Sequence, residues 1–314
     1  MQTLDATEVE RRLDFPTLID RLRDMFRAGC ELPTRHHHPV QVPDAPEAIL
    51  LLMPAWQVGK HIGVKTVTVF PGNGAKGLPA VMGIYILLDG TTGQPLAQID
   101  GRMLTLRRTA AASALAATYL AREDASHHLM IGTGALAPHL IQAHAAIRPI
   151  RRISVWGRNA ETARGLARSL QAKGFAADAT EDLEAAARAA DIVTTATLSA
   201  EPVVMGAWLK PGAHLDLVGA YTPKMRETDD ESVRRGRVYV DTRAGATKEA
   251  GDIVQPLASG VLKEVVGDLF ELTRGKVKGR RSADEITMFK SVGTALEDLA
   301  AAQLAIEHQW IEHH

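Results

Sequence analysis

The sequence predicts an α/β protein in which a Rossmann-type, doubly wound parallel sheet is joined to a second, α+β domain. Two observations support this prediction. The apolar run His128–Ile131 ends at the glycine turn Gly132-Thr133-Gly134, and a helical stretch follows at once. A second apolar strand, Ile153–Trp156, comes about 20 residues later, at the spacing of a dinucleotide-binding βαβ unit.

The glycine turn has the form Gly-x-Gly-x-x-Ala, with Ala137 as its last member. In such turns the glycines let the backbone approach a pyrophosphate group at the N-terminus of the following helix. The motif alone is weak evidence, because a glycine turn in another kind of α/β unit looks the same. Its position between a strand and a helix favours the dinucleotide interpretation.

The chain after residue 120 alternates strand and helix, as doubly wound sheets do. Six strands are predicted, at residues 129–131, 153–156, 176–179, 192–195, 214–218 and 238–240. Helices are predicted at residues 136–147, 160–173 and 181–190. We therefore assign residues 121–293 to a dinucleotide-binding Rossmann domain.

The first 120 residues have an α+β pattern. A helix beginning at Asp14 or Phe15 is predicted by apolar residues at helical spacing, namely Leu18, Ile19, Leu22, Met25 and Phe26. Strand-like runs follow within residues 49–70, then a hairpin at 81–99 and an alanine-rich helix at 104–120. A last helix, Thr294–Glu307, is expected to pack on this domain, which then comprises residues 1–120 and 294–314. The closing His313-His314 are either native or the remnant of a tag.

Composition excludes several classes of function. The formal charge of −1 provides no basic field for nucleic acid or anionic membrane. Cys30 is the only cysteine, which excludes an intrachain disulfide framework. No apolar run approaches the length of a membrane span, and the N-terminus lacks the pattern of a signal peptide. We therefore expect a cytoplasmic protein with no nucleic-acid or membrane partner.

The end of the second Rossmann strand distinguishes the two nicotinamide cofactors. An acidic residue there binds the ribose 2′-hydroxyl of NAD, whereas an arginine accommodates the 2′-phosphate of NADP. Here the positions read Gly157-Arg158-Asn159, with no acidic residue before Glu161. Arg158 can pair with a phosphate bidentately. We therefore expect NADP(H), with NAD(H) as the alternative if Arg158 is only a solvated turn residue.

Three cationic positions in the first domain are unusual. Lys65 lies among alternating valines in a predicted strand, where it either points to solvent or holds an anionic group in a cleft. Arg35 precedes His36–His38, which we interpret as a surface loop, because three consecutive histidines cannot all face one metal ion. Arg107-Arg108 open the alanine-rich helix at its electropositive end, where a nearby anion would relieve the repulsion.

Eight segments then match one family in the family's own order: residues 53–55, 63–73, 87–97, 100–101, 106–111, 132–135, 191–197 and 284–295. The second of these reads Gly-Val-Lys-Thr-Val-Thr-Val-Phe-Pro-Gly-Asn, and the last reads Asp-Glu-Ile-Thr-Met-Phe-Lys-Ser-Val-Gly-Thr-Ala. Over nearly its whole length the chain resembles the ornithine cyclodeaminase/μ-crystallin family. Members of that family include cyclodeaminases, an alanine dehydrogenase and reductases of imines of α-keto acids.

The resemblance implies a homodimer in which the first domain, completed by the last helix, binds a small imino or amino acid and forms the dimer interface. It also implies that Arg35 and Lys65 bind the substrate carboxylate, that Val292 contacts the substrate, and that Arg108 lies where cofactor and substrate meet. The residues expected to bind the cofactor are Arg108, Gly132, Gly134, Ala135, Leu136, Arg158, Asn159, Thr197, Val218, Gly219 and Ser291. No metal is expected.

Residues 219–227 depart from the cyclodeaminases of the family. Those enzymes carry an aspartate in a Gly-Asp-Cys-Pro-Gly-Lys-like motif, whereas this chain has Tyr221 there, in Gly-Ala-Tyr-Thr-Pro-Lys-Met-Arg-Glu. A carboxylate suits a cationic diamine, but a phenol, with a reference pKa of about 10, is neutral at working pH. The Thr-Pro-x-Met-Arg-Glu form resembles the branch of the family that reduces a preformed imine.

The sequence therefore predicts an NAD(P)H-dependent reductase of a cyclic imine carboxylate, of the Δ1-pyrroline-2-carboxylate type, that gives proline or a homologue. Lys65, Arg35 and Tyr221 are the candidate catalytic residues, and the proton donor stays open among Tyr221, Lys65 and water. One alternative is an NAD-dependent amino-acid cyclodeaminase or an alanine-type dehydrogenase. Another is a non-catalytic protein that only binds NADPH.

Overall fold

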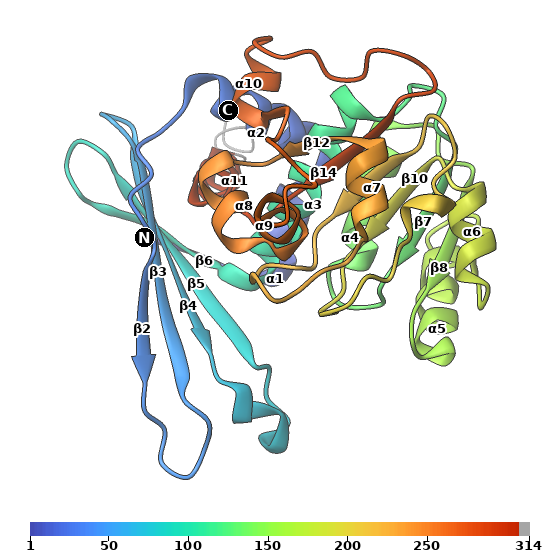
Figure 1. Cartoon of the computed structure of the whole chain (residues 1–314). Helices are drawn as coiled ribbons and strands as arrows, with labels where there is room; N and C mark the ends of the chain where they lie inside the picture. Colours follow the sequence, from blue (N-terminus) through green and yellow to red (C-terminus); the bar gives the residue numbers. More distant parts are fainter. Residues whose placement is uncertain (308–314) are drawn as a thin grey trace. The chain divides into compact units, whose positions relative to one another are not determined.

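The computed structural model describes residues 1–307 (Figure 1), so His313-His314 lie outside the described residues. The chain forms two compact units: Met1–Arg108 together with the chain from Ala295, which we call unit 1, and Thr109–Thr294, which we call unit 2. The division falls within helix α3 (Gly101–Leu120), whereas the sequence placed the boundary at the end of this helix. Within the described residues, no helix has the length and apolar character needed to span a membrane.

Unit 1 is built on a six-stranded sheet with the order β1-β6-β5-β4-β3-β2. The sheet is antiparallel except that β1 runs parallel to β6. Its strands are β1 (Gln2–Leu4), β2 (His36–Val40), β3 (Ala48–Gln57), β4 (His61–Val69), β5 (Val81–Asp89) and β6 (Pro95–Asp100). A short 3-10 helix, η1 (Pro71–Lys76), connects β4 to β5.

The prediction of a surface loop at His36–His38 is wrong. These residues form edge strand β2, in which His36 pairs with Leu52 and His38 with Leu50. All three histidines are nevertheless exposed. A polar triplet followed by proline shows no alternation of apolar residues, so its pairing depends on the neighbouring strand and could not be read locally.

Helices cover one face of this sheet. Helix α11 (Ala295–Glu307) packs on β3, β4 and β5, and helix α2 (Phe15–Ala28) packs on α11. The predicted helix at Phe15 is confirmed: Asp14 caps it by accepting a hydrogen bond from the N–H of Thr17, and its whole predicted apolar face is buried. The short helix α1 (Ala6–Arg12) precedes it.

Unit 2 is an eight-stranded, entirely parallel sheet with the order β13-β12-β14-β11-β10-β7-β8-β9. The Rossmann-type prediction is therefore confirmed. The strands are β7 (His127–Ile131), β8 (Arg152–Trp156), β9 (Ala177–Ala179), β10 (Ile192–Thr195), β11 (His214–Leu217), β12 (Gly236–Val240), β13 (Gly267–Asp268) and β14 (Ile286–Lys290). Connecting helices are α4 (Ala137–Ile147), α5 (Ala160–Gln171), α6 (Leu183–Ala189), η2 (Gly206–Trp208), α7 (Asp230–Arg235), α8 (Arg243–Glu249), α9 (Gly251–Ala258) and α10 (Leu269–Thr273) (Figure 1).

Six strands were predicted for this sheet, and the two that were not predicted are β13 and β14. The more important is β14, whose five residues are all buried and which lies between β11 and β12. It follows a long irregular segment and precedes the last helix, so the alternation of strand and helix that predicted the other strands is absent around it. Helix α3 also begins at Gly101, six residues before Arg107. The prediction that Arg107-Arg108 open the helix is therefore wrong.

Candidate functional site

The order of strands in unit 2 identifies a ligand-binding edge. The chain enters the sheet at β7, adds β8 and β9 on one side, and returns to add β10 on the other. The C-terminal ends of β7 and β10 are thus the topological switch point, where α/β sheets bind their ligands. Gly132 follows β7 with a φ of 115°, and a Cβ on it would lie 2.5 Å from the carbonyl oxygen of Ala196, just beyond β10. The chain's own backbone therefore requires glycine at this position.

Gly134 is glycine for a different reason. A Cβ on it would meet no atom within 4 Å, so nothing in the chain itself excludes a side chain. Gly134 and Ala135 are exposed and Leu136 is half-buried, immediately before α4 begins at Ala137. The turn thus leaves open space at a helix N-terminus, where backbone N–H groups and the helix dipole favour an anion.

A buried carboxylate holds the next two loops of this edge. Glu227 accepts hydrogen bonds from the backbone N–H and hydroxyl of Thr197, at 2.7 and 2.8 Å, and from the backbone N–H of Gly219, at 2.7 Å. A Cβ on Gly219 would overlap the backbone of Thr197 and lie 2.5 Å from Glu227. Val218 is half-buried beside it. Two of the predicted cofactor residues, Thr197 and Gly219, are therefore brought together by a residue that the prediction did not include.

A second buried carboxylate, that of Asp241, holds the loop after β14. It accepts hydrogen bonds from the backbone N–H groups of Val292 and Gly293, both at 2.7 Å, and from the hydroxyl of Ser291 at 3.3 Å. Burial raises the pKa of Asp241, although these hydrogen bonds oppose the shift. The loop that carries Ser291 and Val292 is thereby fixed without any ligand.

One buried cation accompanies these carboxylates. The ammonium group of Lys290 lies 4.0 Å from the carboxylate of Glu227 and 3.5 Å from that of Asp252. Burial raises the pKa of Glu227, with Lys290 opposing the shift. Asp252 in turn accepts a hydrogen bond from the backbone N–H of Glu227 at 2.8 Å.

Arg158 is exposed in the turn after β8. Asn159 has a structural role, because its side chain caps α5 by accepting hydrogen bonds from the N–H groups of Glu161 and Thr162. The carboxylate of Glu161, the first acidic side chain after the strand, forms ion pairs with Arg164 at 3.1 Å and with Arg168 at 2.8 Å. It is therefore engaged on the surface of its own helix.

In unit 1, Lys65 is buried, so the solvent interpretation of this residue is wrong. Only 2% of Lys65 and 5% of Arg108 is exposed. The ammonium of Lys65 lies 2.7 Å from Oδ2 of Asp298, and Nε of Arg108 donates to Oδ1 of the same carboxylate at 2.8 Å. Nη1 of Arg108 donates to Glu297 at 2.7 Å. Lys65 from β4 and Arg108 from α3 thus form one buried cluster with two carboxylates from α11. We call the two cations the cation pair and the four groups together the cluster.

The titration of this cluster follows from burial and charge. Burial lowers the pKa of Lys65 to about 8, although Asp298 pulls it upward. Burial also opposes ionisation of Asp298, but Arg108 and Lys65 outweigh it and lower the pKa of this carboxyl. At neutral pH Lys65 and Asp298 are therefore both charged, and the formal charges of the two cations and the two carboxylates sum to zero.

Arg35 lies just before strand β2. It directly precedes His36, which pairs with Leu52, and the next residue of β3, Met53, pairs with Lys65. Extension of this register by one residue would bring Arg35 level with Lys65, two strands away, with backbones separated by about 10 Å. Long cationic side chains can converge over this distance on a small anion.

Arg107 and Tyr221 are placed differently. Arg107 donates to the backbone carbonyl of Leu13 at 2.9 Å and stacks on Phe15, 3.6 Å from the ring centre. It therefore holds α2 and stays outside the cluster. Tyr221 is 53% exposed in the loop after β11.

The residues that sequence reasoning missed are the carboxylates: Glu227, Asp241, Asp252, Glu297 and Asp298. A signal existed for the last two, because adjacent acids interrupt an otherwise apolar, alanine-rich helix, and buried acids are rare unless paired. No comparable signal marks Asp241 or Asp252. Among residues 1–307, no group of three or more histidine, cysteine or acidic side chains is arranged to hold a metal.

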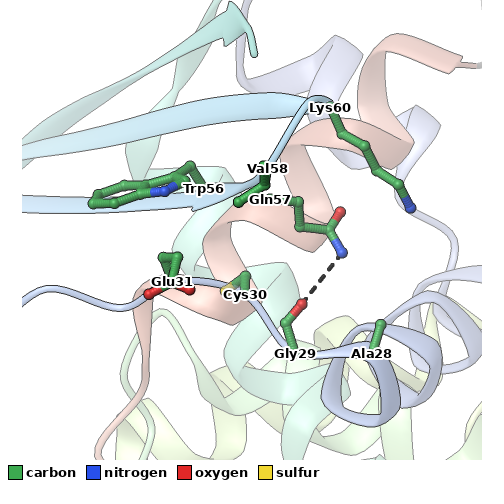
Figure 2. Close-up of a pocket in the computed structure, with 8 residues that line it drawn as sticks. All are labelled: Ala28, Gly29, Cys30, Glu31, Trp56, Gln57, Val58 and Lys60. Carbon is green, nitrogen blue, oxygen red and sulfur yellow. Dashed lines mark hydrogen bonds between the residues drawn. The ribbon is translucent and has the colours of Figure 1, made fainter. Parts of the chain in front are cut away.

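A separate surface pocket of about 420 Å³ lies in unit 1 (Figure 2). Its lining residues are Ala28, Gly29, Cys30, Glu31, Trp56, Gln57, Val58 and Lys60. Figure 2 shows Gln57 closing one side, where its amide donates to the carbonyl oxygen of Gly29 at 3.3 Å. Burial raises the pKa of the Cys30 thiol to about 12, so this cysteine stays protonated. None of the predicted site residues lines this pocket.

Comparisons with known proteins agree with this geometry. The family model of the ornithine cyclodeaminase/mu-crystallin family matches residues 1–313. The chain is 39% identical to a Delta(1)-pyrroline-2-carboxylate reductase of Paracoccus denitrificans, over 96% of this chain and 95% of that protein. The chain belongs to the ornithine cyclodeaminase/mu-crystallin family, and the resemblance predicted from its motifs is confirmed.

Two solved structures share the whole fold. The Delta(1)-pyrroline-2-carboxylate reductase of Thermococcus litoralis, in complex with NADH and L-proline, superposes with a TM-score of 0.91 at 33% identity, covering 99% of this chain and 98% of that one. An archaeal alanine dehydrogenase dimer with bound NAD superposes with a TM-score of 0.90 at 30% identity, covering 100% and 97%.

Proposed function

We propose that this protein is an NAD(P)H-dependent reductase of a cyclic imine carboxylate of the Δ1-pyrroline-2-carboxylate type, giving proline or a homologue. The observation that carries the proposal is the buried cation pair, Lys65 and Arg108, in a chain that also has a dinucleotide-binding sheet. Whole-length similarity to reductases of this substrate supports it. Tyr221, in place of the cyclodeaminase aspartate, favours a preformed imine over a cationic diamine.

A nicotinamide cofactor fits the residues that are present. The open space at Gly134, in front of the N-terminus of α4, matches a pyrophosphate. The loops that carry Thr197, Gly219 and Ser291 follow β10, β11 and β14 at one edge of the sheet, where Glu227 and Asp241 hold them. When bound, the cofactor supplies the hydride that the imine carbon accepts.

The side chains of unit 1 bind and orient the substrate in this proposal. Arg35, just before β2, and Lys65 bind the substrate carboxylate, while Arg108 supports Lys65 through Asp298. Orientation of the acceptor contributes most of the rate enhancement, because a protonated imine is already electrophilic. Lys65, with a pKa of about 8, can also donate the proton that the nitrogen requires near neutral pH. Tyr221 and water remain the alternative donors.

We further propose that the enzyme prefers NADP(H). Arg158 is exposed at the end of β8, and the carboxylate of Glu161, which would repel a 2′-phosphate, is paired with Arg164 and Arg168. In an Arg158→Ala variant, KM for NADPH should rise about tenfold, because an exposed charge-assisted contact is lost. KM for NADH should change less than about twofold. Steady-state kinetics with both cofactors measures this. An equal rise for both would show that Arg158 does not recognise the 2′-phosphate, and no change for either would remove Arg158 from the cofactor site.

We also propose a homodimer in which the uncovered face of the sheet in unit 1 is the interface. The even-numbered residues of β3, β4 and β5 lie on the face of the sheet that points away from α11, and they are largely apolar. Their members include Leu50, Leu52, Trp56, Ile62, Val64, Met82, Ile84, Ile86 and Leu88, none of which is buried. An apolar sheet face of this extent is typical of an interaction surface, and a second copy of the same face is self-complementary in a twofold dimer.

The decisive experiment mixes the purified protein with NADPH or NADH and Δ1-pyrroline-2-carboxylate, and follows cofactor absorbance and the proline formed. We expect one proline per cofactor oxidised. Cofactor binding without turnover of Δ1-pyrroline-2-carboxylate, or of the homologous imine with a larger ring, would establish the non-catalytic alternative. Proline and ammonia formed from ornithine with NAD+ would establish a cyclodeaminase, and alanine formed from pyruvate and ammonia would establish a dehydrogenase.

A further inference from the structure

We propose that Asp298 is a positioning residue that couples Lys65 to Arg108, so that the last helix of the chain sets the geometry of the substrate-binding cations. The proposal rests on the proposed function for its substrate, but its physical basis lies in unit 1 alone. One carboxylate bridges the two cations: Oδ2 faces Lys65 at 2.7 Å and Oδ1 accepts from Nε of Arg108 at 2.8 Å.

The depth of the four groups indicates which of them meets a ligand. Glu297 and Asp298 are fully buried, whereas Lys65 and Arg108 each expose a few per cent of their surface. Neither carboxylate therefore has surface that a substrate could reach. Their role is to hold the cations, since a fixed ionic partner restricts a lysine side chain that otherwise takes many rotamers.

The position of the two acids in helix α11 favours their charged form. Both lie in its first turn, where the positive end of the helix dipole stabilises anions. The cluster is neutral as a whole, so it can be buried without a net charge. Removing one carboxylate leaves a buried positive charge, which is costly.

Asp298 and Glu297 have different partners, and this difference makes a matched test. Asp298 contacts both cations, whereas Glu297 forms its ion pair with Arg108. Both acids are equally buried on one helix turn. Asp298→Asn and Glu297→Gln each remove one charge with little change of shape, and only the first removes the counterion of Lys65.

Turnover gives the first readout. Asp298→Asn should lower kcat/KM for the cyclic imine about a hundredfold, the loss expected when a reacting group is displaced by about 1 Å. KM should rise in the same variant, and the upper limb of the pH profile should move below the wild-type value, because the ammonium of Lys65 loses the anion that stabilises it. Glu297→Gln should lose activity with a smaller shift of this limb, because Glu297 pairs with Arg108 and raises the pKa of Lys65 less than Asp298 does. Equal losses in both variants, with no shift of the limb, would show that Asp298 is only structural.

A second readout needs no turnover. Competitive acetylation of the lysines in the intact protein, followed by peptide mapping, measures the pKa of Lys65 directly. Asp298→Asn should lower that pKa below about 8, and Glu297→Gln should change it less. If the wild type reduces no imine but the acetylation shift is observed, the proposed function fails and the coupling stands. If the wild type is active and neither readout distinguishes the two variants, the coupling fails alone. Melting temperatures and NADH binding identify any variant that has not folded.

Discussion

At the scale of single residues, the sharing of Asp298 between Lys65 and Arg108 determines how the enzyme should respond to pH. Burial lowers the pKa of Lys65 from 10.5 to about 8. Below that pH the side chain is an ammonium that can bind a carboxylate and donate a proton. Above it, both abilities are lost. We therefore expect kcat/KM to fall about tenfold per pH unit above about 8.

Replacement of Lys65 by arginine tests whether this limb belongs to Lys65. An arginine is always charged, so a Lys65→Arg variant should be less active at pH 7 but should lose the limb near pH 8. The measurement is kcat/KM for Δ1-pyrroline-2-carboxylate between pH 6 and pH 10. If the limb persists unchanged in the variant, it reports deprotonation of the substrate iminium or of another group. Arg35→Lys, which retains a cation at a different position, is the control.

The two glycines of the fingerprint should respond differently to alanine. Gly132→Ala should destabilise the protein, because it combines a positive φ with a close contact to Ala196. Gly134→Ala should leave the melting temperature within about 1 °C, because its Cβ meets nothing, but should weaken NADPH binding about tenfold. Thermal unfolding and fluorescence titration separate the two effects. Unchanged NADPH affinity in Gly134→Ala would place the pyrophosphate elsewhere.

How far single residues could be predicted depended on whether their role is local. The glycine turn and Tyr221 are recognisable because their meaning lies in neighbouring residues. That Lys65 is unusual was evident, but its partner was not, since Asp298 lies 233 positions later and nothing in a strand pattern identifies it. The roles of Asp241 and Asp252 could not be predicted for the same reason. Their partners are backbone N–H groups that only the folded chain brings near.

At the scale of elements, a layer of polar side chains within the parallel sheet of unit 2 sets a limit on acid stability. His128 on β7 hydrogen-bonds to Thr194 on β10 at 2.9 Å, and Thr194 donates to Asp216 on β11 at 3.3 Å. His144 from α4 lies 3.1 Å from the same carboxylate. Burial lowers the pKa of His128 well below its usual range, and nearby histidines add to the effect. This histidine is therefore neutral in the folded protein.

A neutral buried histidine destabilises the protein as pH falls. The unfolded chain takes up a proton near pH 6.5 that the folded chain does not, so stability declines below this pH. Between pH 6.5 and 5.5 one such histidine accounts for about 1 kcal/mol, or about 2–4 °C in melting temperature. A His128→Gln variant should show a decline smaller by this amount. A His37→Gln variant, changed at an exposed position, serves as the control and should decline as the wild type does. An equal decline in His128→Gln and the wild type would assign acid sensitivity to other groups.

The elements themselves were largely predictable where periodicity is strong. Helix α2 and strands β7, β8 and β10 follow from apolar spacing and glycine turns, and the structure confirms them. The failures share a cause, because β2 and β14 depend on neighbours supplied by distant parts of the chain. Strand β14 lies between β11 and β12, so its place in the sheet is set by tertiary contacts and not by its own five residues.

At the scale of the whole molecule, the sheet of unit 1 has more apolar surface than its own helices cover. Strand β3 begins Ala-Ile-Leu-Leu-Leu-Met, a continuous apolar run, and such runs are typical of strands buried on both faces. Helix α11 packs on β3, β4 and β5, and Met53, Lys65 and Tyr85 on that side are buried. On the opposite side of these three strands only Ala48, at the start of β3, is buried. The missing cover is what a second copy of the chain provides in the proposed dimer.

A pair of charge substitutions on opposite faces of this sheet tests the dimer. Ile84 is 43% exposed on the uncovered face, whereas Ile49 is 36% exposed on the face that carries α11. An Ile84→Asp variant should be monomeric, because two like charges would be buried against an apolar surface in a twofold interface. Ile49→Asp, of similar exposure, should remain a dimer. Light scattering coupled to gel filtration measures both masses across a range of concentrations. A wild-type monomer at all concentrations, or loss of the dimer in both variants alike, would assign the apolar face of the sheet to some other partner.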